Sequence, residues 1–278
     1  MRLVLTRHPG QAGDMEAAAR RAGYDVRFMP LTQQQLPEDL GDLTRALDDL
    51  QRGAFDWLLL TSPNTVRALR ACGWDGLLPA ETSVAVVGPG TARVLHEHTG
   101  LRPHWMPYDH SAAGIVAELT LPADQTRPAE GAQMLLPQSA HARPDLAEGL
   151  RVRGWQLRHV VAYRSVARDD PARDGSAPES PRLALLQDTD NQHTDDADLL
   201  EPTELGHDDV VLVTSSTAAE AYARRQAPDR QVPAPQPVLL AIGGPTAETL
   251  TRVELPVAAV LPEPTAAGLL SVMNTTVL

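Results

Sequence analysis

Short apolar runs alternate with helical patterns along most of the chain. WLLLTSPNTVRAL, VAVVGPGTARVL and HSAAGIVAEL recur about 154 residues later as VVLVTSSTAAEAY, LLAIGGPTAETL and PTAAGLLSVM. Each segment combines an apolar strand, a turn of Ser, Thr, Gly or Pro, and an Ala/Leu-rich helix pattern. This combination is the βα unit of a parallel sheet. The repetition predicts two similar halves.

A second repeat has a different spacing. RLVLTR, a helix pattern ending at Gly23 and YDVRFMPL recur about 131 residues later as QMLLPQ, a helix pattern ending at Gly154 and WQLRHVVAY. Both glycines suit helix C-caps. Because the two spacings differ by about 23 residues, the second half must carry an insertion between Tyr163 and Val210. This stretch is rich in Asp, Pro, Ser and Thr, so we predict a mobile acidic insertion at about 170–206.

The repeated units predict an α/β fold with parallel sheets. If the βαβ repeat is named A and the three βα units are named B, the chain has the order A-B-A′-B′. One A with one B supplies five strands, which suffice for a flavodoxin-like domain. The pattern alone leaves open whether A pairs with B or with B′. Between A and B, Leu40, Leu43, Leu47 and Leu50 follow helical spacing and predict a helix that faces a core.

Charge and composition exclude several classes of function. The net charge of −12 argues against nucleic acid as a partner, because its binding relies on basic surfaces. All 24 basic Lys and Arg residues are arginines. Schiff-base chemistry, pyridoxal-phosphate anchoring and the Walker P-loop each need a lysine and are excluded.

Cysteine content and hydropathy bear on location. The single cysteine, Cys72, cannot form an internal disulfide, and no Cys/His cluster has the spacing of a metal site, so we expect no metal. The sequence contains no run of 18 apolar residues, so it predicts no membrane span. The segment MRLVLTRHPG has the pattern of a strand and a turn rather than that of a signal peptide. We therefore expect a cytoplasmic protein that does not contact a membrane.

Small polar residues follow the predicted strands, where open α/β sheets bind their ligands. Helices that begin there present unpaired N–H groups and the positive end of the helix dipole, which suit carboxylates or phosphates. For any one turn taken alone, simple helix capping by Ser or Thr is the favoured interpretation. Equivalent turns occur in both halves, and two facing domains would line one cleft with amides. The candidate binding residues are Arg7, Thr61, Ser62, Asn64, Gly88, Ser111, Gln138, Ser139, Ser215, Ser216, Gly244 and Thr246.

Tyr163 is the candidate for chemistry. It ends the strand pattern LRHVVAY, where the chain leaves one domain for the insertion. A phenol there can donate a proton or a hydrogen bond. A partly buried tyrosine with a structural role is the alternative.

The run Arg7-His8-Pro9-Gly10 is similar to the Arg-His-Gly of histidine phosphatases, but proline replaces the glycine and no second histidine lies in a matching turn.

Taken together, the motifs resemble the uroporphyrinogen-III synthase family. The ordered set is LTR, AGYDVRFMPL, FDWLLLTSPNTV, VAVVGPGTA, HSAAGIVAEL, RGWQLRHVVAYRSV, DVVLVTSST, LAIGGPTA and EPTAAGLL, which covers almost the whole chain. Two departures are the insertion after Arg168 and Gln138-Ser139, where many relatives have Arg-Gly. Arg143 lies nearby and is a substitute for the missing charge.

The resemblance implies two flavodoxin-like domains joined by a two-segment linker, with the active site in the inter-domain cleft. It pairs A with B′, so that 1–33 and 168–278 form a discontinuous domain and 37–163 form the other. We expect a monomer.

The implied activity is cyclisation of hydroxymethylbilane, a linear tetrapyrrole with eight carboxylates, to uroporphyrinogen III. The terminal hydroxyl leaves, ring D is inverted through a spiro intermediate, and no cofactor is used. The resemblance gives Tyr163 the role of assisting departure of the hydroxyl. The chain would then be a lyase of porphyrin and heme biosynthesis. A non-catalytic tetrapyrrole- or anion-binding module on the same scaffold is the alternative.

Overall fold

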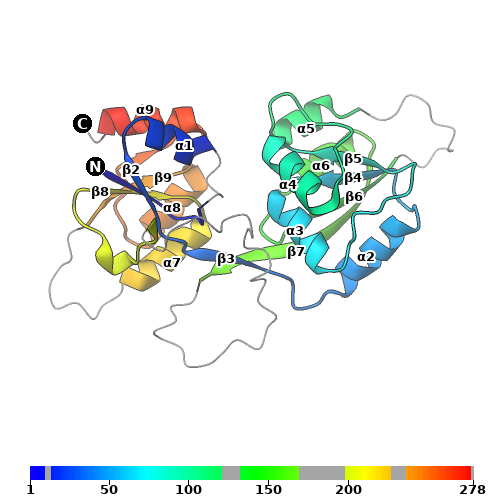
Figure 1. The fold of residues 1–278 in the computed structure, drawn as a ribbon, viewed down its shortest axis with the longest axis horizontal. Helices are drawn as coiled ribbons and strands as arrows, with labels where there is room; N and C mark the ends of the chain where they lie inside the picture. The colour runs from blue at the N-terminus through cyan, green and yellow to red at the C-terminus, as the bar shows by residue number, and fades with distance from the viewer. Residues whose placement is uncertain (10–13, 121–131, 169–197, 227–235, 277–278) are drawn as a thin grey trace. The chain divides into compact units, whose positions relative to one another are not determined.

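The computed structural model describes residues 1–9, 14–120, 132–168, 198–226 and 236–276. These residues form two compact units (Figure 1). Unit 2 contains Gln34–Ser165, and unit 1 contains Met1–Gln33 together with the described residues that follow Ser165. Within the described segments, the chain changes from one unit to the other near Gln33 and near Ser165.

Unit 1 is built on a parallel sheet whose strands come from both ends of the chain. In its described part the strand order is β10-β9-β8-β1-β2. The N-terminal strand lies in the middle, with Leu3 opposite Val26 on one side and Val210 on the other. The strands are β1 (Arg2–Leu5), β2 (Asp25–Phe28), β8 (Asp209–Val213), β9 (Val238–Ala241) and β10 (Ala259–Val260). Repeat A therefore pairs with B′.

Helices cover both faces of this sheet because its strands alternate between two apolar surfaces. Leu3 and Leu5 pack with α1 (Asp14–Arg21) and α9 (Ala266–Thr276), which lie side by side in Figure 1. Val4 packs with α7 (Ser216–Gln226) and α8 (Gly244–Arg252) on the other face.

Unit 2 repeats this arrangement with the modules in the other order along the chain. Its sheet, within the described residues, has the order β3-β7-β6-β4-β5, and the pairs β4/β5, β4/β6 and β6/β7 are parallel. Repeat B therefore pairs with A′. The strands are β3 (Thr32–Gln35), β4 (Trp57–Leu60), β5 (Ser83–Val86), β6 (Gln133–Ser139) and β7 (Gln156–Ala167). The predicted α/β fold with parallel sheets is confirmed.

Two helical layers also cover the sheet of unit 2. Leu58 and Leu60 face α2 (Gly41–Gln51), α3 (Pro63–Ala71) and α4 (Pro89–Thr99), whereas Leu59 faces α5 (Ala112–Glu118) and α6 (Asp145–Val152). The predicted leucine stripe lies on α2 and just before it. Leu43, Leu47 and Leu50 are buried, and Leu40 packs against the same core.

Local predictions about helix ends hold. Gly23 and Gly154 follow α1 and α6 with φ of 88° and 91°, the left-handed conformation that favours glycine. Cys72 is the C-cap of α3 and is partly buried.

Two expectations about β7 and the insertion need correction. Tyr163 does not end its strand, because β7 continues to Ala167 and the Gln34 amide of the neighbouring β3 donates to the Ser165 hydroxyl over 3.3 Å. Residues 170–197, most of the predicted insertion, lie outside the described residues. Its final part is ordered: Leu199 forms a bridge with Phe28 at the edge of β2, and Pro202–Glu204 form the short 3-10 helix η4.

A charge pair holds the first strand against a strand more than two hundred residues later. Arg2 Nε donates to Asp209 Oδ1 over 2.8 Å, and the Gly206 N–H donates to the same carboxylate over 2.7 Å. The Asp209 side chain is 7% exposed. Burial opposes ionisation of Asp209, but the hydrogen bonds from Arg2 and Gly206 outweigh it and lower its pKa. The pair therefore stabilises the contact between repeats A and B′.

We expect Asp209→Ala to lower the free energy of unfolding by about 2 kcal/mol, because a half-buried guanidinium loses its charged acceptor. Since the folded pKa lies below the ordinary value, this contribution is present above about pH 4 and is lost as the pH falls further. Urea unfolding at neutral pH measures it. The control Asp49→Ala removes an exposed ion pair with Arg52 and changes stability by less than about 0.5 kcal/mol. Equal effects of the two variants would contradict this assignment.

Candidate functional site

The carboxyl ends of the parallel strands form one edge of each sheet, here named the carboxyl edge. In unit 2, Ser62 and Tyr163 meet there: the Tyr163 hydroxyl donates to Ser62 Oγ over 3.3 Å. Ser62 is the N-cap of α3, with an extended backbone and Pro63 at the first helical turn. Its Oγ also accepts the Asn64 N–H over 3.1 Å. One serine oxygen thus joins the strand tyrosine to the start of a helix, as its predicted capping role requires.

A break in the register between β6 and β7 brings Tyr163 to this position. Gln138 lies opposite Val161, but the next residue, Ser139, lies opposite Tyr163. The extra residue, Ala162, forms a bulge, so Ala162 and Tyr163 both pack into the core below α3 instead of facing opposite sides. Without the bulge, the strand alternation would turn Tyr163 away from Ser62.

The surroundings of Tyr163 keep its phenol neutral. The residue is 8% exposed. Burial raises the pKa of Tyr163, and the hydrogen bond with Ser62 opposes this only in part. At neutral pH the group therefore carries its proton.

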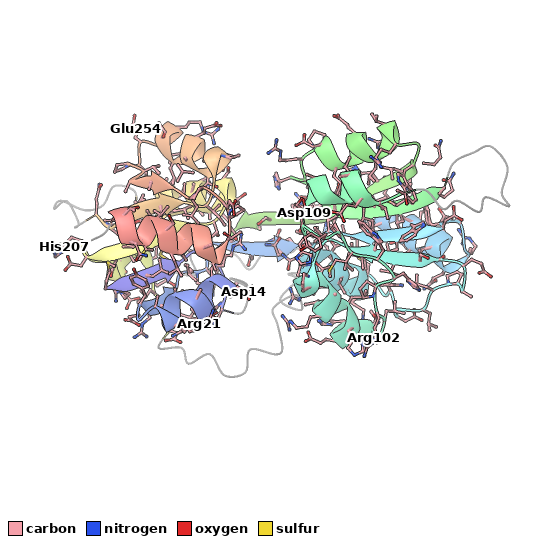
Figure 2. All side chains as sticks on the ribbon, turned by 90° about the horizontal axis from the view of Figure 1, so that it is seen from above. Asp14, Arg21, Arg102, Asp109, His207 and Glu254 are labelled. Atoms are coloured by element: carbon pink, nitrogen blue, oxygen red, sulfur yellow. The ribbon has the colours of Figure 1, made fainter. Side chains whose placement is uncertain are left out.

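Two further predicted residues begin helices at the carboxyl edge of unit 2. Gly88 is the N-cap of α4, and Ser111 is the N-cap of α5, where its Oγ accepts the Gly114 N–H over 2.9 Å. The Asp109 carboxylate, labelled in Figure 2, accepts from the Ser111 N–H and hydroxyl, both over 2.9 Å. His110 has a φ of 53°, and a Cβ added at Gly88 would lie 3.3 Å from the His110 Cβ. A side chain at position 88 would therefore press against His110.

The remaining predicted residues of unit 2 differ in exposure. Gln138 is buried, Thr61 and Asn64 are half-buried, and Arg143 is exposed and pairs with Asp145 over 3.0 Å. Ser139 Oγ accepts the His141 N–H over 3.2 Å. The exposed Arg143 lies just after β6, so its charge is available to a ligand only from the loop before α6.

The carboxyl edge of unit 1 has a buried threonine pair at its centre. The Thr214 N–H donates to Thr6 Oγ1 over 3.0 Å, and the two hydroxyl oxygens lie 3.1 Å apart. Arg7 follows directly, with Nη2 3.5 Å from the Thr214 carbonyl oxygen. Burial lowers the pKa of Arg7. The threonines fix the two strand ends from which Arg7 and the next turn begin.

Two turns of unit 1 are linked to each other. Ser215 Oγ accepts the Ala218 N–H over 3.0 Å, and the Ser216 hydroxyl donates to the Pro245 carbonyl over 3.1 Å. The N-cap of α8 is Gly243, one residue before the predicted Gly244, which is the first residue of the helix. Thr246 is 4% exposed, so its side chain lies inside the unit. Gly243 is therefore the counterpart of Gly88, which the alignment of VAVVGPG with LLAIGGP already indicates.

Both edges thus offer N–H and hydroxyl donors at helix starts, together with one neutral phenol in unit 2. Donors of this kind suit carboxylates. Among the described residues, no group of three or more His, Cys, Asp and Glu side chains is arranged to hold a metal ion.

Comparison with known proteins identifies the family. A family model described as uroporphyrinogen-III synthase HemD matches residues 13–271. The chain belongs to the uroporphyrinogen-III synthase family.

Individual members of the uroporphyrinogen-III synthase family are only distantly similar. A putative uroporphyrinogen-III synthase of Methanothermobacter thermautotrophicus is 30% identical over 172 residues, which are 60% of this chain and 64% of the relative. The chloroplastic uroporphyrinogen-III synthase of Oryza sativa subsp. japonica is 27% identical over 173 residues, 60% of this chain and 54% of the relative. These alignments cover less than two thirds of each relative's length.

A solved structure supports the fold. The uroporphyrinogen-III synthetase of Helicobacter pylori has a TM-score of 0.52 with 14% identity and covers 99% of both chains. In the described part of this chain, no helix is long and apolar enough to cross a membrane.

Arg67 and His110 are not among the residues predicted from the sequence. Arg67 is 5% exposed and lies on the first turns of α3 next to Asn64. In the helical pattern of TSPNTVRAL, Arg67 shares a face with Asn64 and Arg70, three residues before and after it, so no sequence signal marks it as a buried charge.

We expect Tyr163 to titrate above the ordinary tyrosine pKa of about 10, because burial disfavours the phenolate. The measurement is an alkaline titration of phenolate absorbance for the wild type and Tyr163→Phe, with the difference assigned to Tyr163 while circular dichroism shows that the fold persists. A difference curve with its midpoint at or below 10 would contradict the burial described here.

Proposed function

We propose that this chain is a uroporphyrinogen-III synthase, a lyase that converts hydroxymethylbilane to uroporphyrinogen III with loss of water and inversion of ring D. The observation that carries the proposal is the neutral Tyr163 hydroxyl, hydrogen-bonded to Ser62 at 3.3 Å, in a chain of this family. The runner-up function, a non-catalytic tetrapyrrole- or anion-binding module, would use the same donors but leave the bilane unchanged.

Tyr163 suits the first chemical step. The terminal hydroxyl of the bilane leaves more easily when a donor hydrogen-bonds to it or protonates it. A phenol whose pKa is raised keeps this proton at neutral pH, and the raised pKa also limits how completely the proton is transferred. We therefore assign Tyr163 a helping role rather than an indispensable one. The start of α3, next to Ser62, carries the positive end of the helix dipole and favours negative charge on the nearby phenol oxygen.

The carboxylates of the substrate call for many donors. We propose that Ser62, Gly88 and Ser111 of unit 2, and Ser215 and Gly243 of unit 1, bind acidic side arms through the N–H groups of the helices that they begin. The overall charge of −12 does not oppose this binding, because charges beyond about 10 Å are screened at physiological salt. Arg7 and Arg143 are the charged candidates beside these turns.

Positioning is the main task of the proposed enzyme. Unaided, the bilane loses water and closes head to tail, which gives isomer I. An enzyme must hold the chain so that the substituted carbon of ring D meets the electrophile first. Dispersed contacts supply this orientation, and holding the reacting atoms in the right geometry can increase the rate of ring closure greatly. The reaction has no net electron transfer, so the proposal includes no cofactor. A monomeric state, a cytoplasmic location and the absence of nucleic-acid binding stay predictions.

A coupled assay tests the function. Hydroxymethylbilane is generated in place, and isomers I and III are separated by chromatography after oxidation. We expect isomer III to predominate. Isomer I alone, at the rate seen without the protein, would overturn the proposal and favour the binding module.

For Tyr163→Phe we expect kcat to fall about ten- to a hundredfold, because general-acid assistance contributes about 10²–10⁴ at most and water replaces part of it. The KM should change little. The control is Tyr24→Phe, since Tyr24 contacts Asn274 over 3.5 Å in unit 1 and has no proposed role. Unchanged kcat in Tyr163→Phe would remove this residue from the mechanism.

A further inference from the structure

A buried arginine lies directly behind the candidate residues of unit 2. Arg67, on α3, is 5% exposed, although arginines are rarely buried without a specific role. Its Nη1 donates to Asn64 Oδ1 over 3.1 Å. Asn64 is one turn earlier on the same helix, so the two residues lie on neighbouring positions of one face.

This hydrogen bond determines which way the Asn64 amide points. A guanidinium has donors and no acceptor, so the atom facing Arg67 must be the oxygen of the carboxamide. The amide nitrogen, with two N–H donors, is left on the other side. The Asn64 backbone is also held, because its N–H donates to Ser62 Oγ, the atom that accepts from Tyr163. Asn64 is thus anchored at both its backbone and its side chain.

We propose that Arg67 is a positioning residue, which locks the Asn64 carboxamide with its N–H donors toward the carboxyl edge, where they bind a substrate carboxylate beside Ser62 and Tyr163. The proposal rests on the proposed function and adds to it the device that selects a carboxylate at this point. If the amide rotated by half a turn, it would present its oxygen and repel a carboxylate.

Packing alone does not call for arginine at this position. Val66, Ala68 and Leu69 of the same helix are buried in the apolar core of unit 2. An apolar side chain of similar volume would avoid the cost of desolvating a guanidinium. A positioning role through Asn64 makes use of the guanidinium, because a group that cannot accept hydrogen bonds excludes the wrong amide orientation.

The test is a double-mutant cycle with Arg67→Met, Asn64→Ala and the double variant, in the full chain. The probe is uroporphyrin III, a stable octacarboxylate, and the readout is its dissociation constant, followed by KM and kcat with hydroxymethylbilane. We expect each single variant to weaken binding and raise KM about three- to tenfold, with kcat within about twofold of the wild type, because one hydrogen bond to a charged group is lost or misdirected. The double variant should match Asn64→Ala alone.

Two further variants separate positioning from structural support. Arg67→Lys retains a donor and the positive charge and should restore part of the affinity. Arg70→Met is the matched control, since Arg70 lies on the same helix, is exposed and donates to the Trp74 carbonyl, and it should leave affinity and KM unchanged.

Several outcomes would overturn the inference. The first is unchanged affinity in Arg67→Met. The second is that Arg67→Met weakens binding as much in the Asn64→Ala background as it does in the wild type. The third is that the wild type does not bind uroporphyrin III. If Arg67→Met unfolds, Asn64→Asp takes its place: it keeps the acceptor for Arg67 but puts a carboxylate at the edge, and it should weaken binding about tenfold or more while remaining folded. Wild-type affinity in Asn64→Asp would overturn the inference. Binding with normal coupling but without turnover would overturn only the proposed function.

Discussion

Parallel pairing between strands that are far apart in the chain is the constraint on which both candidate edges depend. In a parallel sheet all strands end on the same side, so every following helix begins there and turns its free N–H groups in that direction. In unit 1 this edge exists only because β1 lies between β2 and β8, with Leu3 beside both Val26 and Val210. The ion pair of Arg2 with Asp209 reinforces the same contact from the opposite end of the strands.

The two units use this geometry differently. At the carboxyl edge of unit 1, the Thr6–Thr214 pair links two strand ends, and the Ser216 hydroxyl donates to the Pro245 carbonyl. These hydrogen bonds hold the turns of this edge against each other. The carboxyl edge of unit 2 instead carries the phenol of Tyr163, which a bulge turns toward the helix that begins after Ser62. The roles that we propose are therefore asymmetric, with donors for acidic side arms on both units and the proton donor on one.

Four linked polar residues, two of them buried and two half-buried, order the carboxyl edge of unit 2. Tyr163, Ser62, Asn64 and Arg67 form a continuous chain of hydrogen bonds. In a low-dielectric surrounding, such a chain is costly to break, so each member holds its neighbour in one orientation. For function, this means that both polar groups are oriented as hydrogen-bond donors. The phenol is neutral and donates, and we infer that the Asn64 amide presents its nitrogen rather than its oxygen to a polyanionic substrate.

The sequence by itself determined the local elements and their order. Strands, helix caps and turns depend on residues that are close together in the chain, so local patterns predict them. Examples are the apolar runs, the Ser-Pro and Gly-Pro helix starts, and the glycines at 23 and 154. The ordered motifs predict the family. The repeats left the pairing of A with B′ open, and only the family resemblance implied it before the sheets showed it. Nothing in the sequence indicated that Tyr163 faces α3 or that Arg67 is buried against Asn64. Strand partners, a one-residue bulge and the burial of a charge depend on contacts between distant segments. Periodicity along one chain carries no record of them.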